Sequence, residues 1–428
     1  MAVLDFIIQE IFGSAPIFLS LIALIGLLLQ RKPFPEVLSG TFKTALGVVI
    51  LTKGVEIIIG AILPLATAFG VFSATSGEPI VSMGSAAFMD QYGSTIGIAM
   101  VSAFAINLFV ARFTKWKSVF LTGHMLYWFP FIFVAAGVDA GLSGTTLVLV
   151  ATLFTAAYII ITPNIIRPFV REVTGDDSFT LGHPTVGLSL IAGYIGKWFG
   201  DKSKSTEDLK FSKNLSFLKE ISITSSIVIV LVYSVLMLIL TFSGQNALEI
   251  FEIASVTEVF SFLLMMGLTF GAGLTVLLLG VRMMIAEIVP AFTGFQEKLI
   301  PDAIPALDCP LLFPYAPNAL IIGFVVSMFS STAAIVLFAV AGVFPYVIAP
   351  LTITSFFEIG TASIIGNATG GRRGAILGSA VAGVVMVLLV GFSIPFLQTT
   401  VADWIIIFGG NDFSLWAIIQ GLFARLIS

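Results

Sequence analysis

The sequence predicts an all-α polytopic membrane protein, arranged as an inverted repeat of two five-helix halves with two re-entrant hairpins and a short C-terminal helix. Three observations lead to this fold class. First, 58% of the 428 residues are hydrophobic and only 10% are charged, whereas roughly a quarter of the residues in soluble domains are charged. Second, apolar stretches of about 20 residues, long enough to cross a bilayer, recur along the whole chain. Third, one short segment recurs after an odd number of these stretches.

The apolar stretches are expected to be helices, because lipid cannot satisfy backbone polar groups and uninterrupted apolar runs do not fit the alternating pattern of a barrel. The first stretch lacks a basic leader and a cleavage site, so we expect it to be a retained helix. The ten predicted helices cover residues 11–29, 41–63, 94–111, 118–138, 143–166, 221–243, 262–288, 318–343, 346–367 and 375–397.

We expect one membrane domain, 1–428, with repeat halves at about 1–168 and 220–398, a cytoplasmic linker at 169–219 and a C-terminal segment at 399–428. The basic residues predict the orientation in a bacterial inner membrane. If the loop 167–219 is cytoplasmic, every Lys and Arg except Lys53, Arg282 and Arg425 lies in a segment on that side. This asymmetry is typical of multi-pass membrane proteins.

The composition also excludes several classes of function. Cys309 is the only cysteine, which excludes an internal disulfide and a multi-thiolate metal site. We interpret it as a small buried thiol. The sequence has no GxxxxGK[ST] motif for nucleotide phosphates and no basic, aromatic-interleaved segment typical of nucleic-acid binding. We therefore expect the lipid bilayer as surroundings, and no cofactor, metal or nucleic-acid partner.

The internal repeat consists of GVEIIIGAILP, residues 54–64, and GVRMMIAEIVP, residues 280–290, which align without gaps. Each copy precedes a semi-apolar segment rich in Gly, Pro, Ser and acidic residues, 71–91 and 300–318. The copies end the second and lie in the seventh predicted helix, five helices further along the chain, and because five is odd the halves should have opposite orientations. We expect the two segments to be re-entrant hairpins that meet near the midplane of the membrane. Surface loops, and a match that reflects shared composition alone, are the alternatives.

The run GVRMMIAEIVPAFTGFQEKLIPDAIPALDC, residues 280–309, resembles the ascorbate-type IIC transporters of the phosphoenolpyruvate-dependent phosphotransferase system (PTS). Further landmarks of that family follow the same order: LTGH at 121–124, LGH at 181–183, STEDLK at 205–210, APNA at 316–319, and Asn367 with Gly370 and Gly371. The resemblance implies a homodimer with a scaffold and a moving core, which carries its solute by an elevator-like displacement.

The resemblance also implies a function, namely translocation of ascorbate or a related sugar acid or polyol. A separate phospho-IIB subunit would phosphorylate the solute, with IIA, HPr and enzyme I upstream. Trp128 and Pro184 stand where family members that recognise ascorbate have glutamine, and Ser82 stands where a tyrosine is expected. These differences leave the identity of the solute open.

The candidate site residues follow from the resemblance and from chemistry. His124 and His183 are the only histidines, and the resemblance places both around the sugar. Asp308 lies between prolines in an apolar segment, where an ionised carboxylate is costly without compensation. Either Asp308 or His183 is expected to accept the proton of the sugar hydroxyl. The other expected solute contacts are Ser82, Ser85, Trp128, Asn318 and Asn367.

Several alternatives remain open at this point. His183 could have only a surface role, and Asp308 could cap a helix. Lys53, Glu56 and Arg282 are expected to form a structural network, whereas Glu358 could face the pocket or serve a proton pathway. A proton-coupled secondary transporter of a small polar solute, using Asp308 and Glu358, is the main alternative function. A sensor or channel is a further one.

Overall fold

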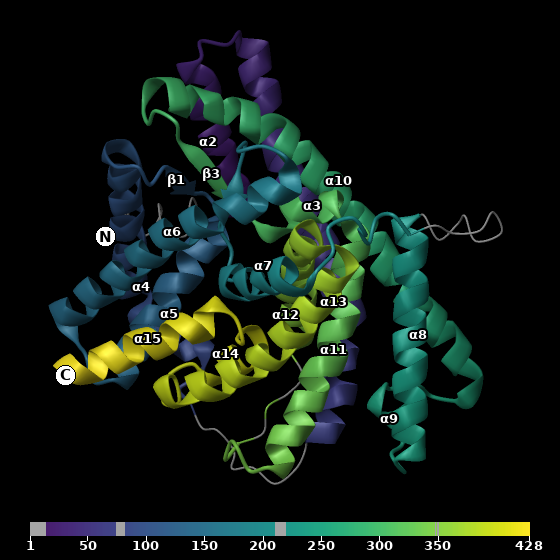
Figure 1. The fold of residues 1–428 in the computed structure, drawn as a ribbon. Coiled ribbons are helices and arrows are strands. Elements are labelled where there is room, and N and C mark those ends of the chain that lie inside the picture. Colours follow the sequence, from purple (N-terminus) through teal and green to yellow (C-terminus); the bar gives the residue numbers. More distant parts are fainter. Residues whose placement is uncertain (1–13, 74–81, 210–219, 347, 349–350) are drawn as a thin grey trace.

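The computed structural model describes residues 14–73, 82–209, 220–346, 348 and 351–428, and most of them are helical (Figure 1). The α-helices are α2 Ala15–Leu29, α3 Phe34–Ser73, α4 Ser85–Phe113, α5 Gly123–Asp139, α6 Gly144–Thr174, α7 Val186–Phe199, α8 Ile221–Phe242, α9 Ala247–Ile250, α10 Val259–Lys298, α11 Pro317–Val340, α12 Thr352–Thr354, α13 Gly360–Ser393, α14 Ala402–Phe408 and α15 Asp412–Ile427. Short 3-10 helices are η3 Val256–Glu258, η4 Cys309–Tyr315 and η6 Ile394–Phe396, and η5 Ser355–Ile359 is a π-helix.

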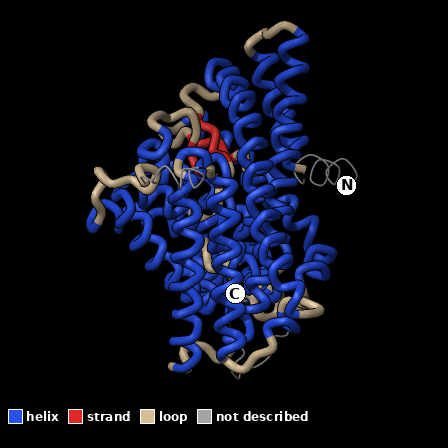
Figure 2. Tube along the Cα trace, turned by 90° about the vertical axis from the view of Figure 1, so that its right-hand side faces the viewer, coloured by secondary structure: helices blue, strands red, loops and turns tan. Residues whose placement is uncertain are grey.

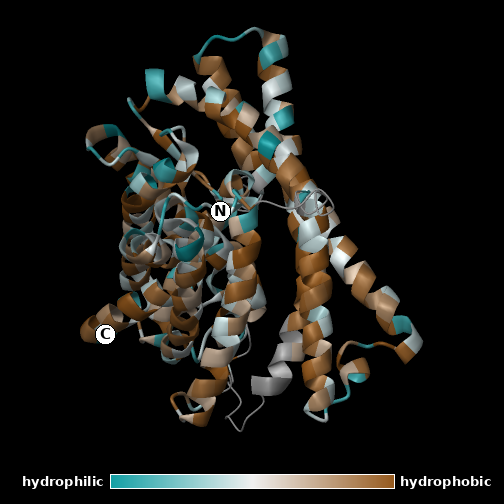
Figure 3. Cartoon of the chain, turned by 45° about the vertical axis from the view of Figure 1, so that its right-hand side comes forward, coloured by the Kyte–Doolittle hydropathy of each residue, from teal (hydrophilic) through white to brown (hydrophobic). Residues whose placement is uncertain are grey.

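Seven described segments are long and apolar enough to cross a membrane, namely 34–65, 85–113, 144–174, 222–242, 256–298, 317–340 and 352–396. Hydrophobic residues predominate along these helices, and hydrophilic residues gather in the segments that connect them (Figure 3). The predicted tenth helix, 375–397, lies largely in α13, whereas the described part of the predicted ninth, 346–367, corresponds to α12, η5 and the beginning of α13. Gly370 and Gly371, which leave the helical conformation, separate the two. The chain is therefore a multi-pass membrane protein with mostly helical structure.

Helices α3 and α10 are each 40 residues long and pack against each other in opposite directions. A Cβ added to Gly47 would lie 2.8 Å from the Met284 nitrogen, and one added to Gly54 would lie 2.5 Å from Leu277 Cα. The residue number in α10 falls as the number in α3 rises, which makes the pair antiparallel. Glycine at these positions lets the two backbones approach closely, as is common between membrane helices.

The described helices form two groups. In the first group, α2 and α8 pack against the α3–α10 pair. Tyr233 of α8 donates a hydrogen bond to the Ala61 carbonyl of α3 at 2.7 Å. In the second group, α4, α5 and α6 pack against one another, α15 packs against α5, and α13 packs against α6, α7 and α11. Residues of α3 face residues of the second group across the cavity described below.

A three-stranded sheet, which the all-α prediction missed, lies within the second group (Figure 2). Its strands are β1 Ser118–Phe120, β2 Thr180–Leu181 and β3 Ile304–Leu307, all parallel, in the order β1-β3-β2. Ser118 pairs with Ile304, and Leu181 pairs with Leu307. The strands are very short and buried, so they lack the alternating pattern by which strands are recognised in a sequence.

The side chain of Asn107 in α4 closes the outer edge of β1. Its amide nitrogen donates to the Ser118 carbonyl at 3.0 Å, and its oxygen accepts from the Phe120 N–H at 3.0 Å. Backbone groups at an edge strand inside a membrane protein must find partners. Asn107 therefore replaces a neighbouring strand and explains why so small a sheet ends at β1.

Three predicted segments differ in the structure. The helix predicted at 118–138 begins only at Gly123, because β1 precedes it. The linker predicted at 169–219 contains the end of α6, then β2 and α7, with 210–219 outside the described residues. The segment 300–318, predicted as a hairpin, contains β3 and η4, whereas part of the first such segment, 74–81, lies outside the described residues.

Candidate functional site

The three parallel strands end at the three residues that the sequence suggests for chemistry. Asp308 directly follows β3, His183 comes two residues after β2, and His124 lies in the first turn of α5, shortly after β1. The carboxyl ends of parallel strands meet at one edge of a sheet, which is where ligands commonly bind in parallel sheets. The small sheet therefore brings together residues that are far apart in the sequence.

Asp308 lies between the two histidines. Its Oδ2 is 3.5 Å from Nε2 of His124, and its Oδ1 is 3.5 Å from Nε2 of His183. The side chains of His124, Asp308 and His183 are 41%, 19% and 5% exposed. The solvent exposure of the side chains thus decreases from His124 through Asp308 to His183. A solute can therefore reach His124 and Asp308 from the cavity.

Asp308 also caps η4. Its Oδ1 accepts a hydrogen bond from the Cys309 N–H at 2.7 Å. Asp308 therefore caps a helix, as the sequence suggested as an alternative, and also lies between the two histidines. The cap holds the carboxylate in place, while Oδ2 stays on the side of His124.

His183 is buried, which excludes a surface role. Burial lowers the pKa of its imidazole from 6.5 to about 4, and although the Asp308 carboxylate acts in the opposite direction, burial dominates. His183 is therefore neutral at pH 7 and can accept a proton. Its Nδ1 is buried and has no hydrogen-bond partner among the described residues.

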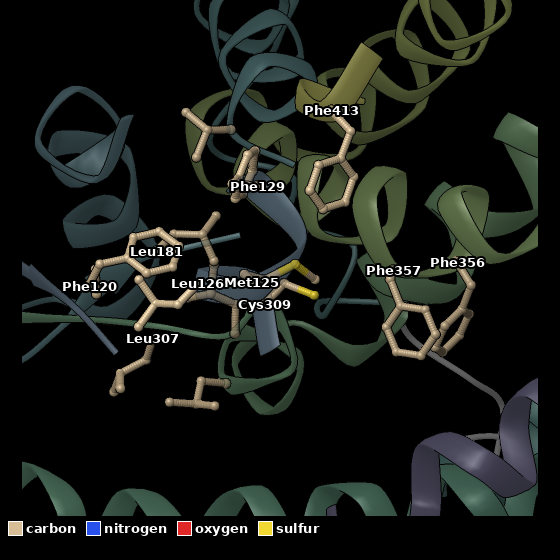
Figure 4. Packing of buried hydrophobic residues seen from close by; sticks show 14 of the residues in the cluster. Phe120, Met125, Leu126, Phe129, Leu181, Leu307, Cys309, Phe356, Phe357 and Phe413 are labelled. Carbon is tan, nitrogen blue, oxygen red and sulfur yellow. The ribbon is translucent and has the colours of Figure 1, made fainter. Parts of the chain in front are cut away.

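The three residues line a cavity of about 870 Å³. Its walls come from α2, α3, α5, η4, α12, η5, α14 and α15, and they are mainly apolar. Trp128 and Trp404 form one wall with ring centroids 5.0 Å apart. Figure 4 shows other parts of the wall, with Met125, Phe357 and Phe413 projecting from three different helices. Apolar walls with a few converging polar groups are typical of a binding site for a small molecule.

Three further charged residues line this cavity, namely Glu358, Lys53 and Glu56. Lys53 and Glu56 form the expected pair at 2.7 Å, but Arg282 forms no ion pair with a described residue. The sequence left the direction of Glu358 open, and the structure places it toward the cavity. The π-helix that carries Glu358 has no simple sequence signal, although such turns often mark functional sites.

Comparison with known proteins finds a family that matches most of the chain. The EIIC-GAT family model, described as "PTS system sugar-specific permease component", matches residues 10–412. The chain belongs to this family. The match includes all three strands and every residue that lines the cavity of this PTS permease component except Phe413. It confirms the resemblance inferred from the sequence.

A curated relative of the permease component has the name "Ascorbate-specific PTS system EIIC component" and comes from Mycoplasma pneumoniae. The two proteins are 25% identical in an alignment 433 positions long, gaps included, which covers 88% of this chain and 64% of the relative. The chain therefore spans a little less than two thirds of the length of that curated relative.

Two expected contact residues of the permease component, Ser82 and Ser85, do not line the cavity. The Ser82 hydroxyl donates to Oδ1 of Asp403 at 3.2 Å, and the Ser85 N–H donates to Oδ2 at 3.1 Å. Asp403 therefore holds the beginning of α4 against α14. Because Trp404 follows Asp403 and does line the cavity, this contact borders the site without entering it.

Asn318 and Asn367, also expected as contact residues, bind the loop that contains Ser205 and Thr206. The Asn367 oxygen accepts from the Thr206 N–H at 2.9 Å, and its amide nitrogen donates to the Ser205 hydroxyl at 3.1 Å. The amide nitrogen of Asn318 lies 3.4 Å from the Thr206 carbonyl. In this conformation both side chains stabilise a loop, and neither lines the cavity.

His183, Asp308 and Cys309 each place one potential ligand atom within 4.8 Å of the others. A soft metal ion would need the Cys309 thiolate. Burial, together with the nearby Asp308 charge, raises the pKa of the Cys309 thiol well above its usual value. The thiol is therefore protonated when no metal ion is bound to it.

Proposed function

We propose that this PTS permease component carries ascorbate, or a related sugar acid or polyol, across the bacterial inner membrane for phosphorylation by a separate IIB subunit. The observation that carries the proposal is the row His124, Asp308 and His183 along the wall of a cavity in a sugar-permease family member. The name of the relative from Mycoplasma pneumoniae supports ascorbate as the first solute to test.

In this proposal the polar row binds hydroxyl groups of the solute, and Trp128 packs against its less polar face. Buried polar groups are costly without hydrogen bonds, and a polyol offers many donors and acceptors. Ser82, Ser85, Asn318 and Asn367 have other partners in this conformation, so we assign them no contact with the solute in this state.

Phosphoryl transfer would follow from the same geometry. The solute hydroxyl oxygen attacks the phosphorus atom carried on a cysteine of phospho-IIB, the P–S bond breaks, and IIB leaves as a thiolate. The hydroxyl proton passes to Asp308 or to the neutral imidazole of His183, which are 3.5 Å apart. The products are the solute phosphate and dephosphorylated IIB, which IIA, HPr and enzyme I would rephosphorylate.

For the architecture we propose an inverted repeat that moves as an elevator within a homodimer. The antiparallel packing of α3 and α10 supports opposite orientations, because the two repeated segments, 54–64 and 280–290, lie in these helices. The position of the cavity between α3 and the second group of helices supports a scaffold and a moving part. The basic residues support a cytoplasmic location for 167–219.

Uptake into right-side-out vesicles tests the proposed function. Vesicles that contain enzyme I, HPr, IIA, IIB and phosphoenolpyruvate should accumulate radiolabelled L-ascorbate, or a neutral hexitol such as galactitol, as its phosphate. Uptake should stop when phosphoenolpyruvate is omitted and should continue with a protonophore. Recovery of unmodified solute, with uptake that collapses when the protonophore is added, would instead favour the proton-coupled transporter, for which Glu358 and Asp308 lie in the same cavity.

A further inference from the structure

We propose that Glu358 is a further solute-binding residue, whose carboxyl group forms a hydrogen bond with a hydroxyl of the carried sugar or polyol. This inference rests on the proposed function and adds a second polar contact to the row formed by His124, Asp308 and His183. Three observations support it: the backbone conformation around Glu358, the hydrogen-bond partners of its two carboxyl oxygens, and its position at the cavity.

The backbone around Glu358 is built in an unusual way. Residues Ser355–Ile359 form a π-helix between α12 and α13. A π-helical turn departs from the hydrogen-bond pattern of the α-helix, and such turns occur frequently at functional sites. Here the Glu358 carbonyl accepts a hydrogen bond from the Thr185 hydroxyl at 2.6 Å. Thr185 lies two residues after His183, so the π-helix and the His183 loop are fixed relative to each other.

The two carboxyl oxygens of Glu358 differ in their surroundings. Oε1 accepts a hydrogen bond from the Asn411 amide at 2.9 Å. The Asn411 oxygen accepts from the Phe413 N–H at 3.1 Å, which orients the amide and caps α15. Oε2 is buried and has no hydrogen-bond partner among the described residues. Asn411 therefore fixes the carboxyl group and leaves one oxygen for another partner.

A carboxyl oxygen in this position needs a partner. Glu358 is 6% exposed, and its neighbours along the cavity wall include Phe357, Phe408 and Phe413. None of these side chains can form a strong hydrogen bond. Oε2 of Glu358 has therefore lost its hydrogen bonds to water without gaining others, which costs free energy. A hydroxyl group can donate to an ionised carboxylate and can also accept from a protonated carboxyl. A sugar or polyol hydroxyl can therefore form a hydrogen bond with this oxygen whether Glu358 is ionised or protonated.

The positions of Asp308 and Glu358 restrict which solutes can bind. A molecule that contacts Asp308 with one hydroxyl and Glu358 with another must carry several hydroxyl groups. Trp128, Trp404 and Phe357 line the same cavity, and their rings favour contact with the C–H face of a sugar or polyol. A solute with a single polar end would leave either Asp308 or Glu358 unpaired.

Solute binding by purified protein tests the proposal. The probes are L-ascorbate, L-gulono-1,4-lactone, galactitol and D-glucitol, measured by calorimetry with wild type, Glu358→Gln and Glu358→Ala. For the probe that binds the wild type best, Glu358→Ala should weaken binding about 10- to 100-fold. Glu358→Gln keeps a hydrogen-bonding group and should stay within about threefold of the wild type. The exposed Glu258→Gln is the matched control and should bind like the wild type.

Melting temperatures without solute separate binding from folding. Similar melting temperatures with weaker binding by Glu358→Ala would support the proposal. Binding by Glu358→Ala that equals that of the wild type would overturn it. Weak binding by both substituted proteins, accompanied by a lower melting temperature in both, would show that Glu358 acts on the fold and would also overturn it.

Cysteine labelling gives a readout that does not depend on the identity of the solute. In a Cys309→Ala background, Glu358→Cys should react with a small anionic methanethiosulfonate reagent, whereas Ser363→Cys, buried on α13, should not. If no probe binds the wild type, the proposed solute class is wrong, and the labelling alone then decides whether position 358 faces the cavity. An unreactive Glu358→Cys would overturn the inference. Protection of this cysteine by a bound probe would support it directly.

Discussion

The hydroxyl of Tyr158 lies 2.9 Å from Oδ2 of Asp412 and 3.0 Å from the carbonyl of His183. Oδ1 of Asp412 accepts from the Gly187 N–H at 2.8 Å, and the Asp412 N–H donates to the Pro184 carbonyl at 2.9 Å. The beginning of α15 therefore holds both ends of the loop 183–187. Through this loop it holds His183 against Asp308.

Tyr158→Phe is expected to loosen this loop. The substitution keeps the ring but removes the only donor that Tyr158 offers, so a buried carboxylate and a carbonyl each lose a partner. We expect the protein to lose about 1–3 kcal/mol of stability and to bind solute more weakly. Thermal unfolding in detergent and calorimetric binding measure the two effects. The exposed Tyr194→Phe is the control, and equal behaviour of the two variants would contradict the role of Tyr158.

His183 should titrate at an unusually low pH. Its pKa of about 4 in the folded protein lies below the ordinary value of 6.5, so the unfolded chain binds the proton more tightly. The contribution of His183 to stability is therefore complete above about pH 6.5. It is lost as the pH falls toward 4, by up to about 1.4 kcal/mol per pH unit.

Nitrogen-15 NMR of labelled histidine measures this titration, and only two histidines contribute signals. The His124→Gln variant assigns the remaining signal to His183. A midpoint near pH 6.5 for that signal would show that His183 is not buried as described.

Asp308→Asn should abolish phosphorylation of the solute while the protein still inserts and folds. Asparagine can still accept from the Cys309 N–H, so the cap of η4 is retained, but it cannot take a proton. General-base catalysis contributes roughly 10²- to 10⁴-fold, and we expect a loss in this range in the reconstituted system. His183→Gln tests the other candidate base in the same assay.

The neighbouring Asp302→Asn is the control, because Asp302 is exposed and asparagine tolerates its positive φ of 60°. Normal turnover by Asp308→Asn would remove Asp308 from the reaction. A larger loss for His183→Gln than for Asp308→Asn would assign the proton to the imidazole.

Gly371→Ala should destabilise the break in α13. Gly371 has a φ of 58°, and an added Cβ would lie 2.5 Å from the Lys204 carbonyl oxygen. The loop there is also held by hydrogen bonds from Asp201 N–H to the Gly370 carbonyl at 2.8 Å and from Arg372 N–H to the Lys204 carbonyl at 2.7 Å. We expect a loss of more than about 1 kcal/mol, since both strain and a clash contribute.

The matched control for this substitution is Gly244→Ala. Gly244 has a similar φ of 76° but open space around it. It therefore reports the cost of a positive φ without a steric clash. Equal melting temperatures of the two variants would show that the contact between Gly371 and the loop 201–204 contributes nothing.

The sequence predicted most of the long apolar helices, and it named three residues that the structure places side by side at the cavity. The length of an apolar stretch determines whether it can form a membrane-spanning helix. Helices α8 and α11 therefore lie close to their predicted positions, and α3 contains its predicted helix. His124, His183 and Asp308 were named from motifs, and the sheet places them together. The pair Lys53–Glu56 follows from spacing on one helical face.

Other features depend on contacts between distant segments, which a single sequence does not display. The three strands total only nine residues, and the residues that pair across the sheet are more than 120 positions apart in the sequence. The direction of Glu358 depends on a π-helix that Thr185 and Asn411 stabilise. Asn318 and Asn367 lie in family-like motifs, and Ser82 stands where a tyrosine is expected. The structure gives Ser82 the partner Asp403, and it gives both asparagines the loop around Thr206.

A structure of the wild-type protein with bound solute, determined by cryo-electron microscopy in lipid nanodiscs, tests the central claim most directly. The account predicts density for the solute in the cavity, within hydrogen-bond distance of Asp308 and Glu358 and in contact with Trp128. Density at another location, such as the Ser82–Asp403 contact or the loop around Thr206, with an empty cavity, would contradict it.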